Sequence, residues 1–208
     1  MPAPVALQLY TLREAANDDF EEVVRRVAEM GYAGVEPAGF PGSSPEEAGR
    51  LFRSLGLDVP SAHLGIPVGE HKQYSIEAAQ AIGATRIISG VGPSDLDTMD
   101  KIKSVCDKFN EASASAGEYG MTFGIHNHWW EFLKVDGGYV YETILDNLVP
   151  EVFFEVDVYW VQTGGPDPAA VVRQLGARAP ILHIKDGPCT REDDMTAVGE
   201  GIVDISAV

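Results

Sequence analysis

Two blocks of the sequence carry histidines and carboxylates at spacings that suit metal binding or proton transfer. In FGIHNHWWEF (residues 123–132), His126 and His128 are two residues apart, so in an extended strand both side chains point to the same face. A turn after His128 would bring Glu131 back over that face. Imidazoles and a carboxylate that converge in this way form a donor set for a divalent cation such as manganese, cobalt, zinc, iron or magnesium.

Further carboxylates and imidazoles interrupt two apolar runs nearer the carboxyl end. Glu155 and Asp157 share one face of VFFEVDVYW, and His183 and Lys185 share one face of APILHIKDG. A carboxylate in apolar surroundings costs several kcal/mol unless a cation or hydrogen-bond donors satisfy it. We expect Asp157 and His183 to bind the metal and Glu155 to form a structural ion pair.

The elements that position these residues follow a repeated pattern, in which an amphipathic helix ends at a glycine and a short β-rich run follows. The glycines suit the left-handed position just after a helix; they are Gly31, Gly56, Gly83, Gly120 and Gly176. Helices are expected over 18–30 with Asp18 as N-cap, over 44–55 with Ser44 as N-cap, around 78–82, 102–109 and 144–148, and from Asp167 to Leu175. Seven strands are expected over 5–9, 33–36, 58–63, 85–89, 122–126, 152–156 and 180–184.

The positions of the polar residues favour a closed barrel over an open doubly wound sheet. Nearly every expected strand ends in a polar side chain, namely Gln8 with Tyr10, Glu36, His63, Ser89, His126 with His128, Asp157, and His183 with Lys185. A barrel brings all its strand ends to one mouth, whereas an open sheet uses only those near its switch point. The first strand is also followed by LQLYTLREA instead of a glycine-rich phosphate loop.

Six blocks of the chain together resemble the xylose-isomerase-like TIM barrel superfamily, in particular its sugar phosphate isomerases and epimerases, with inosose dehydratases and 3-keto-sugar-processing enzymes nearby. The blocks are QLYTLR, GYAGVE, HNHWWEF, EVDVYWVQTGGPDP, LHIKD and VGEGIVDI, and they extend over essentially the whole chain. The resemblance implies a (β/α)8 barrel formed by a single domain over residues 1–208. It also implies an eighth strand and closing helices, which this chain lacks.

The same resemblance implies a set of site residues. The metal ligands carry over as Glu131, Asp157 and His183, although relatives often have the glutamate within the fifth strand, where His126 stands here. If that register applies, His126 or His128 is the ligand and the other imidazole is the catalytic acid or base. The substrate pocket would be lined by Gln8, Glu36, His63, Trp160 and Lys185. Lys185 or backbone amides of VGEGIVD would contact a phosphate or acid group.

These residues lead to a function hypothesis with two alternatives. A bound cation polarises a carbonyl while a base removes the adjacent proton, a step shared by sugar isomerases, epimerases and keto-sugar dehydratases. The first alternative is a non-catalytic sugar-binding domain or remnant enzyme. The second, an apurinic-endonuclease-like metal hydrolase, is disfavoured because 32 acidic residues face only 15 basic ones, which gives a net charge of -17.

The composition predicts the surroundings in which the protein works. The chain of 208 residues has two cysteines, no signal-like start and no apolar stretch of about 20 residues. We therefore expect a cytoplasmic protein whose partner is a small sugar or keto-sugar, without nucleic acid or membrane contacts. Without the eighth strand, the first and seventh strands would have unpaired edges, so we expect either a fragment of a longer protein or a homo-oligomer in which another copy covers the gap.

Overall fold

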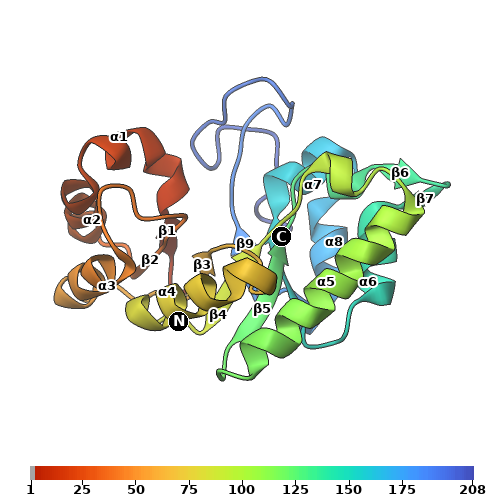
Figure 1. The fold of residues 1–208 in the computed structure, drawn as a ribbon. Coiled ribbons are helices and arrows are strands. Elements are labelled where there is room, and N and C mark those ends of the chain that lie inside the picture. The colour runs from red at the N-terminus through yellow and green to blue at the C-terminus, as the bar shows by residue number, and fades with distance from the viewer. Residues whose placement is uncertain (1–2) are drawn as a thin grey trace. The chain divides into compact units, whose positions relative to one another are not determined.

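The computed structural model describes residues 3–208 and divides them into two compact units (Figure 1). Unit 1 comprises the described residues up to Ser89 together with Ala114–Thr122, and unit 2 comprises Gly90–Ser113 and Phe123–Val208. Both units are built from short parallel strands connected through helices, which is the α/β pattern predicted from the sequence.

Unit 1 contains four parallel strands that follow one another in chain order. The elements are β1 (Ala6–Gln8), a 3-10 turn at Leu9–Leu12, α1 (Arg13–Asp18), α2 (Phe20–Glu29), β2 (Gly34–Glu36), α3 (Pro45–Ser54), β3 (Ala62–His63), a 3-10 turn at Gly69–His71, α4 (Lys72–Ile82) and β4 (Arg86–Ser89). Strand β1 pairs with β2, and β3 pairs with β4. Isolated parallel bridges connect β2 and the residues after it with the segment that ends in β3.

Unit 2 is organised around a central strand with a parallel neighbour on each side. It holds most of α5 (Met99–Gly117) and β5 (Thr122–His126), and then β6 (Lys134–Val135), β7 (Gly138–Tyr139), α6 (Val140–Asn147), β8 (Phe153–Asp157), α7 (Val158–Gly164), α8 (Pro168–Leu175) and β9 (Ile181–His183). Further 3-10 turns lie at Pro93–Asp95, Trp130–Phe132 and Gly176–Arg178. Strand β8 pairs with β5 and with β9, while β6 and β7 form a small antiparallel hairpin.

Most of the predicted elements are confirmed. All seven strands are present, and the five helix-terminating glycines have φ between 52° and 87°. The capping box of Ser44 with Glu47 and the cap at Asp167 are also confirmed. The N-cap prediction at Asp18 is wrong by one residue: Asp18 ends α1, and Asp19 accepts the N–H of Glu22 at 3.0 Å.

Three elements were not predicted from the sequence, for a common reason. Helix α1, helix α7 and the β6–β7 hairpin are short, and none of them shows a complete hydrophobic period. Helix α7 also begins directly after Asp157, without a loop, so its first residues extend the apolar run of β8. In addition, α4 begins at Lys72, several residues before the expected region around 78–82.

Aromatic side chains pack within each unit. In unit 1, Phe20 of α2 packs against Phe52 of α3, with ring centroids 6.2 Å apart. In unit 2, Phe109 of α5 packs against Phe123 of β5 at 5.7 Å. The first contact joins two helices, and the second holds α5 against β5, the strand that ends in His126. No helix in the described part of the chain has the length and apolar character needed to cross a membrane.

The carboxylate of Asp186 organises the segment that follows β9. It is 1% exposed and accepts backbone N–H groups from Gly187, Gly199, Gly201 and Val203 at 2.8–3.1 Å. Burial alone would raise the pKa of Asp186, but these four donors lower it. Three amides of the VGEGIVDI block are therefore engaged within the protein and not directed at a ligand. No further parallel strand follows β9 among residues 184–208.

This arrangement predicts that Gly201 tolerates no side chain. A Cβ there would lie 2.1 Å from Oδ1 of Asp186 and 2.2 Å from N of Gly187, so Gly201→Ala must displace the carboxylate from its donors. We expect a loss of about 1–3 kcal/mol in the free energy of unfolding. Gly117→Ala is the matched control, because a Cβ at that position meets nothing within 4 Å. Equal stability of the two variants in urea denaturation would contradict this role of Asp186.

Candidate metal centre

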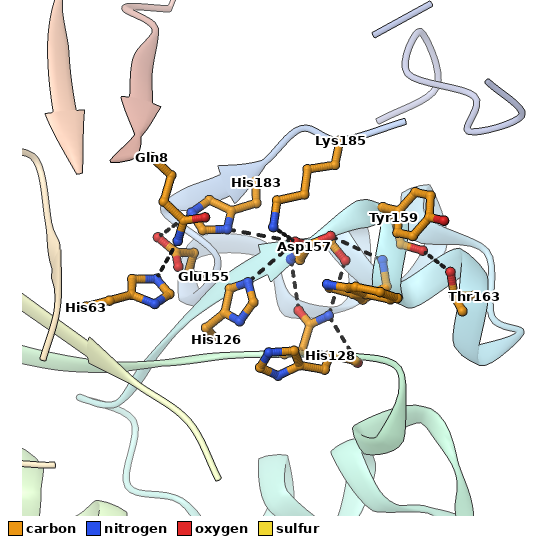
Figure 2. Close-up of polar contacts among 12 residues, drawn as sticks. Gln8, His63, His126, His128, Glu155, Asp157, Tyr159, Thr163, His183 and Lys185 are labelled. Atoms are coloured by element: carbon orange, nitrogen blue, oxygen red, sulfur yellow. Dashed lines mark hydrogen bonds and ion pairs between the residues drawn. The ribbon is translucent and has the colours of Figure 1, made fainter. Parts of the chain in front are cut away.

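Three buried side chains in unit 2 point towards one another from the ends of adjacent strands (Figure 2). They are His126 at the end of β5, Asp157 at the end of β8 and His183 at the end of β9. Nε2 of His126 lies 3.4 Å from Oδ2 of Asp157, and Nδ1 of His183 lies 3.8 Å from the same oxygen. One ligand atom from each residue lies within 4.8 Å of the others, a geometry that is consistent with a metal site.

The strand register explains why these residues meet. Asp157 is the direct Cα partner of His183, and Glu155 is the direct partner of His126. Parallel strands end at the same edge of a sheet, so the last residues of β5, β8 and β9 converge there. Asp157 is 0% exposed, and both histidines are less than 10% exposed.

Lysine 185 supplies the positive charge nearest to the buried carboxylate. Its Nζ lies 2.7 Å from Oδ2 of Asp157. Burial by itself would raise the pKa of Asp157, but the interaction with His126 and the charges of Lys185 and His183 outweigh it and lower the pKa below its ordinary range. Asp157 is therefore an ionised carboxylate at neutral pH, the form in which a carboxylate can bind a metal.

Asparagine 127, which the sequence analysis did not single out, fixes the backbone of Asp157. Its Nδ2 donates to the carbonyl of Asp157 at 3.1 Å, and its Oδ1 accepts the N–H of Asp157 at 2.9 Å. The second oxygen of the Asp157 carboxylate caps α7 by accepting the N–H of Trp160 at 3.1 Å. No signal within the HNHWWEF block indicates this role, because the partner of Asn127 is the backbone of another strand.

Glutamate 155, for which a structural ion pair was expected, contacts His183. Its Oε1 lies 3.2 Å from Nε2 of His183, and the side chain is 0% exposed. Histidines that bind metals commonly direct their second nitrogen to a carboxylate, which fixes the tautomer and the orientation of the ring. With Nε2 facing Glu155, Nδ1 of His183 faces Asp157.

Glutamate 131 does not join this group, although it was expected to be a metal ligand. Its Oε2 accepts the backbone N–H of His128 at 2.8 Å, and its side chain lines an apolar pocket with Phe132, Tyr141 and Ile144. Burial raises the pKa of Glu131 to about 8. The chain does turn after β5, as predicted. The turn places the side chain of Glu131 in a neighbouring pocket and not in the group of three converging residues. In the described part of unit 2, the group of three converging residues contains His126 and not Glu131.

Histidine 128 belongs to an aromatic cluster beside the three converging residues. Its ring stacks on Trp130 at 4.1 Å with an interplanar angle of 13° and meets the edge of His126 at 4.8 Å. The indole of Trp160 lies 6.4 Å from His128, and Trp130 is held by a hydrogen bond from Nε1 to the carbonyl of Val91 at 3.1 Å. The cluster offers flat apolar faces next to polar groups.

The expected substrate-binding residues of unit 1 also come together. Nε2 of Gln8 donates to Oε1 of Glu36 at 3.1 Å and lies 3.3 Å from Nε2 of His63. Nε2 of His63 lies 3.2 Å from Oε1 of Glu36, and Ser61 donates its hydroxyl to the other oxygen of Glu36. Glu36 is 4% exposed, so this group is a compact polar cluster at the ends of β1, β2 and β3.

Comparisons with known proteins match most of the chain. A family model described as xylose isomerase-like TIM barrel matches residues 24–208. A sugar phosphate isomerase/epimerase from Parabacteroides distasonis is similar, with 25% identity, a TM-score of 0.75, and coverage of 93% of this chain and 78% of that chain. A comparison with curated proteins found no match.

Two other solved structures share the fold at lower identity. The 3-keto-D-glucoside 4-epimerase from E. coli has 19% identity and a TM-score of 0.66, with 99% of this chain and 85% of that chain covered. The IolI protein, whose structure holds a zinc atom, has 14% identity and a TM-score of 0.72, with 99% and 82% covered.

The buried Glu131 predicts a defined pH dependence of stability. Its pKa is about 8 in the folded protein against an ordinary value of 4.5, so between these values the folded chain holds a proton that the unfolded chain has lost. The free energy of unfolding should therefore fall as pH rises through this window, by up to about 1.4 kcal/mol per pH unit. Glu131→Gln should remove this contribution and be more stable than the natural chain at pH 8.

The matched control for this measurement is Glu111→Gln on the exposed face of α5. Urea denaturation at several pH values between 5 and 8.5 gives the slope directly. If the natural chain and Glu131→Gln keep parallel pH profiles, Glu131 is ionised throughout and the interpretation of its pocket is wrong.

Proposed function

Because the chain belongs to the xylose isomerase-like TIM barrel family, we propose that it is a divalent-metal-dependent enzyme that removes a proton from the carbon next to the carbonyl of a sugar or keto-sugar. Isomerisation, epimerisation and dehydration share this step, so the proposal covers sugar isomerases, epimerases and related lyases. The observation that carries it is the buried convergence of His126, Asp157 and His183.

The donor set suits the proposed cation. Two imidazoles and one carboxylate are ligands that zinc, iron, manganese and cobalt accept, and three protein ligands leave positions open for substrate. We assign these ligands to His126, Asp157 and His183, with Glu155 orienting His183 and Asn127 positioning Asp157. When bound, the metal would polarise the carbonyl and a neighbouring hydroxyl of the sugar.

Histidine 128 is the residue that we assign to proton transfer. With His126 used as a ligand, His128 is the remaining imidazole of the HNHWWEF block, and its ring lies 4.8 Å from that of His126. An imidazole has an ordinary pKa near 6.5, which suits proton transfer near neutral pH. Stacking on Trp130 holds the ring in one orientation, as a base that must reach a single substrate carbon requires.

The remaining polar side chains are proposed to bind the substrate. Lys185 can donate to a substrate oxygen, and the face of Trp160 can pack against a sugar ring. In unit 1, the cluster of Gln8, Glu36 and His63 is described by itself, and its part in substrate binding stays a prediction from the sequence. Nucleic acid as a substrate is disfavoured by the net charge of -17.

One observation favours a second candidate function, a non-catalytic sugar-binding protein. Nζ of Lys185 lies 2.7 Å from Asp157, so an internal ammonium group can neutralise the buried carboxylate without a metal. Under this alternative, the same residues bind a sugar but do not turn it over. Metal-dependent exchange of a substrate proton separates the two functions.

The test is exchange of the substrate proton in deuterated water. With manganese present, the natural chain should incorporate deuterium at the carbon next to the carbonyl of a 3-keto-sugar, and His128→Gln should slow this by about 100-fold or more. His71→Gln is the control, because His71 is exposed and lies outside the proposed site. If the protein shields the transferred proton from solvent, no deuterium is incorporated. The turnover rates of substrates that carry hydrogen or deuterium at that carbon are then compared, and a slower rate with deuterium shows that this proton is removed.

Two results would refute the proposal. One is exchange in the chelator-treated protein at the same rate as in the manganese-loaded protein. The other is full activity of His128→Gln.

A further inference from the structure

The side chain of Glu131 connects a closed apolar pocket of unit 2 with the backbone of His128. Glu131 is 5% exposed, and its Oε2 accepts the N–H of His128 at 2.8 Å. The pocket that it lines is walled by β5, β8, α6 and α8, and its volume of about 10 Å³ is room for one water molecule at most. Such a pocket is too small for a ligand, so the chemical role of Glu131 lies in its bond to His128.

The backbone of His128 is held on both sides by buried side chains. Its N–H donates to Glu131, and its carbonyl oxygen lies 3.5 Å from Nδ2 of Asn127. Asn127 is itself bonded to the backbone of Asp157, which connects this segment to β8. The rotamers open to a side chain depend on its backbone angles, so holding this backbone restricts the direction of the imidazole.

The turn that carries Glu131 is packed closely enough to serve as a fixed support. It is the 3-10 turn Trp130–Phe132, and α7 lies directly against it at Gly164. A Cβ on Gly164 would lie 2.5 Å from Cβ of Phe132 and 2.9 Å from the carbonyl oxygen of Trp129. The position of the Glu131 carboxyl group is therefore set by the core of unit 2.

The interaction between Glu131 and His128 is one of geometry and not of charge. Burial raises the pKa of Glu131 to about 8, so the carboxyl group is mostly protonated at neutral pH. A neutral carboxyl group still offers an acceptor oxygen to a backbone N–H. It adds no negative charge beside the imidazole.

We propose that Glu131 is a positioning residue for His128, which its hydrogen bond holds against Trp130 and beside His126 (Figure 2). The benefit to proton transfer rests on the proposed function, in which His128 is the base. A base displaced by about 1 Å can cost roughly 100-fold in rate. The positioning itself is measured without substrate or metal.

Nuclear magnetic resonance of the full chain after treatment with a chelator tests the positioning. The stacked indole of Trp130 shifts the ring-proton signals of His128 upfield, and His128→Gln identifies these signals among those of the five histidines. Glu131→Met removes the acceptor, so the signals should move towards those of an unstacked histidine. Glu131→Gln keeps an acceptor oxygen and should retain the natural shift.

The matched control is Val171→Ala, which opens the same pocket with a side chain that has no polar atom to bond to His128. Urea denaturation shows whether each variant is folded. If Glu131→Met does not fold, Glu131→Asp replaces it, because its carboxyl group is one methylene shorter. The proposal is overturned if the loss of the acceptor leaves the His128 signals unchanged, or if Val171→Ala or Glu131→Gln moves them equally.

Proton exchange into a 3-keto-sugar separates a failure of this proposal from a failure of the proposed function. If the natural chain catalyses exchange, Glu131→Met should lower kcat about tenfold or more and change KM less than about twofold, because the base moves while the substrate contacts remain. Glu131→Gln and Val171→Ala should keep kcat, and an equal loss of kcat in either would overturn the proposal. If the natural chain catalyses no exchange, the proposed function fails, and the His128 signals alone decide whether Glu131 positions the ring.

Discussion

The neutralisation of one buried carboxylate, that of Asp157, is the constraint on which the arrangement of unit 2 depends. Isolated burial of an ionised carboxylate is far more costly than the net stability of a typical domain, so the surroundings must compensate for it. Asp157 is completely buried at the end of the central strand β8, and a lysine and two histidines approach its Oδ2. The backbone N–H of Trp160 bonds to the other oxygen.

A second buried carboxylate in the same unit is stabilised in a different way. Asp186 is satisfied by four backbone N–H groups, and it holds the segment after β9 in place. A carboxylate with so many neutral donors needs no cation. Asp157 instead faces the imidazoles of His126 and His183, which are themselves possible metal ligands, and for this reason we assign it, and not Asp186, to the metal.

The sequence allowed the fold to be predicted well because its signals are local. Each signal depends on a few neighbouring residues: the glycines at helix ends, the caps at Ser44 and Asp167, and the apolar runs. The predicted TIM-barrel class is confirmed by the family match. Short elements without a full hydrophobic period, such as α7, were missed. The boundary at Asp18 was off by one because two consecutive aspartates can both cap a helix.

The candidate site was harder to predict because side-chain directions after a strand depend on the turn. His126, Asp157 and His183 lie within strands, where alternation and register fix their faces, and they converge. Glu131 lies beyond the strand, in a 3-10 turn that directs it to His128 and an apolar pocket. Asn127 was overlooked because its role is to pair with the backbone of a neighbouring strand, and that pairing is not visible in one segment.

Calorimetric titration of manganese into the natural chain, Asp157→Asn and Lys185→Met tests the central claim most directly. The account predicts that the natural chain binds one ion and that Asp157→Asn binds none detectably. Lys185→Met should bind about tenfold tighter or more, because the ammonium group no longer competes for Oδ2. Equal affinities for the natural chain and Asp157→Asn, or no binding by any of the three proteins, would contradict the assignment of Asp157 as the ligand around which the site is built.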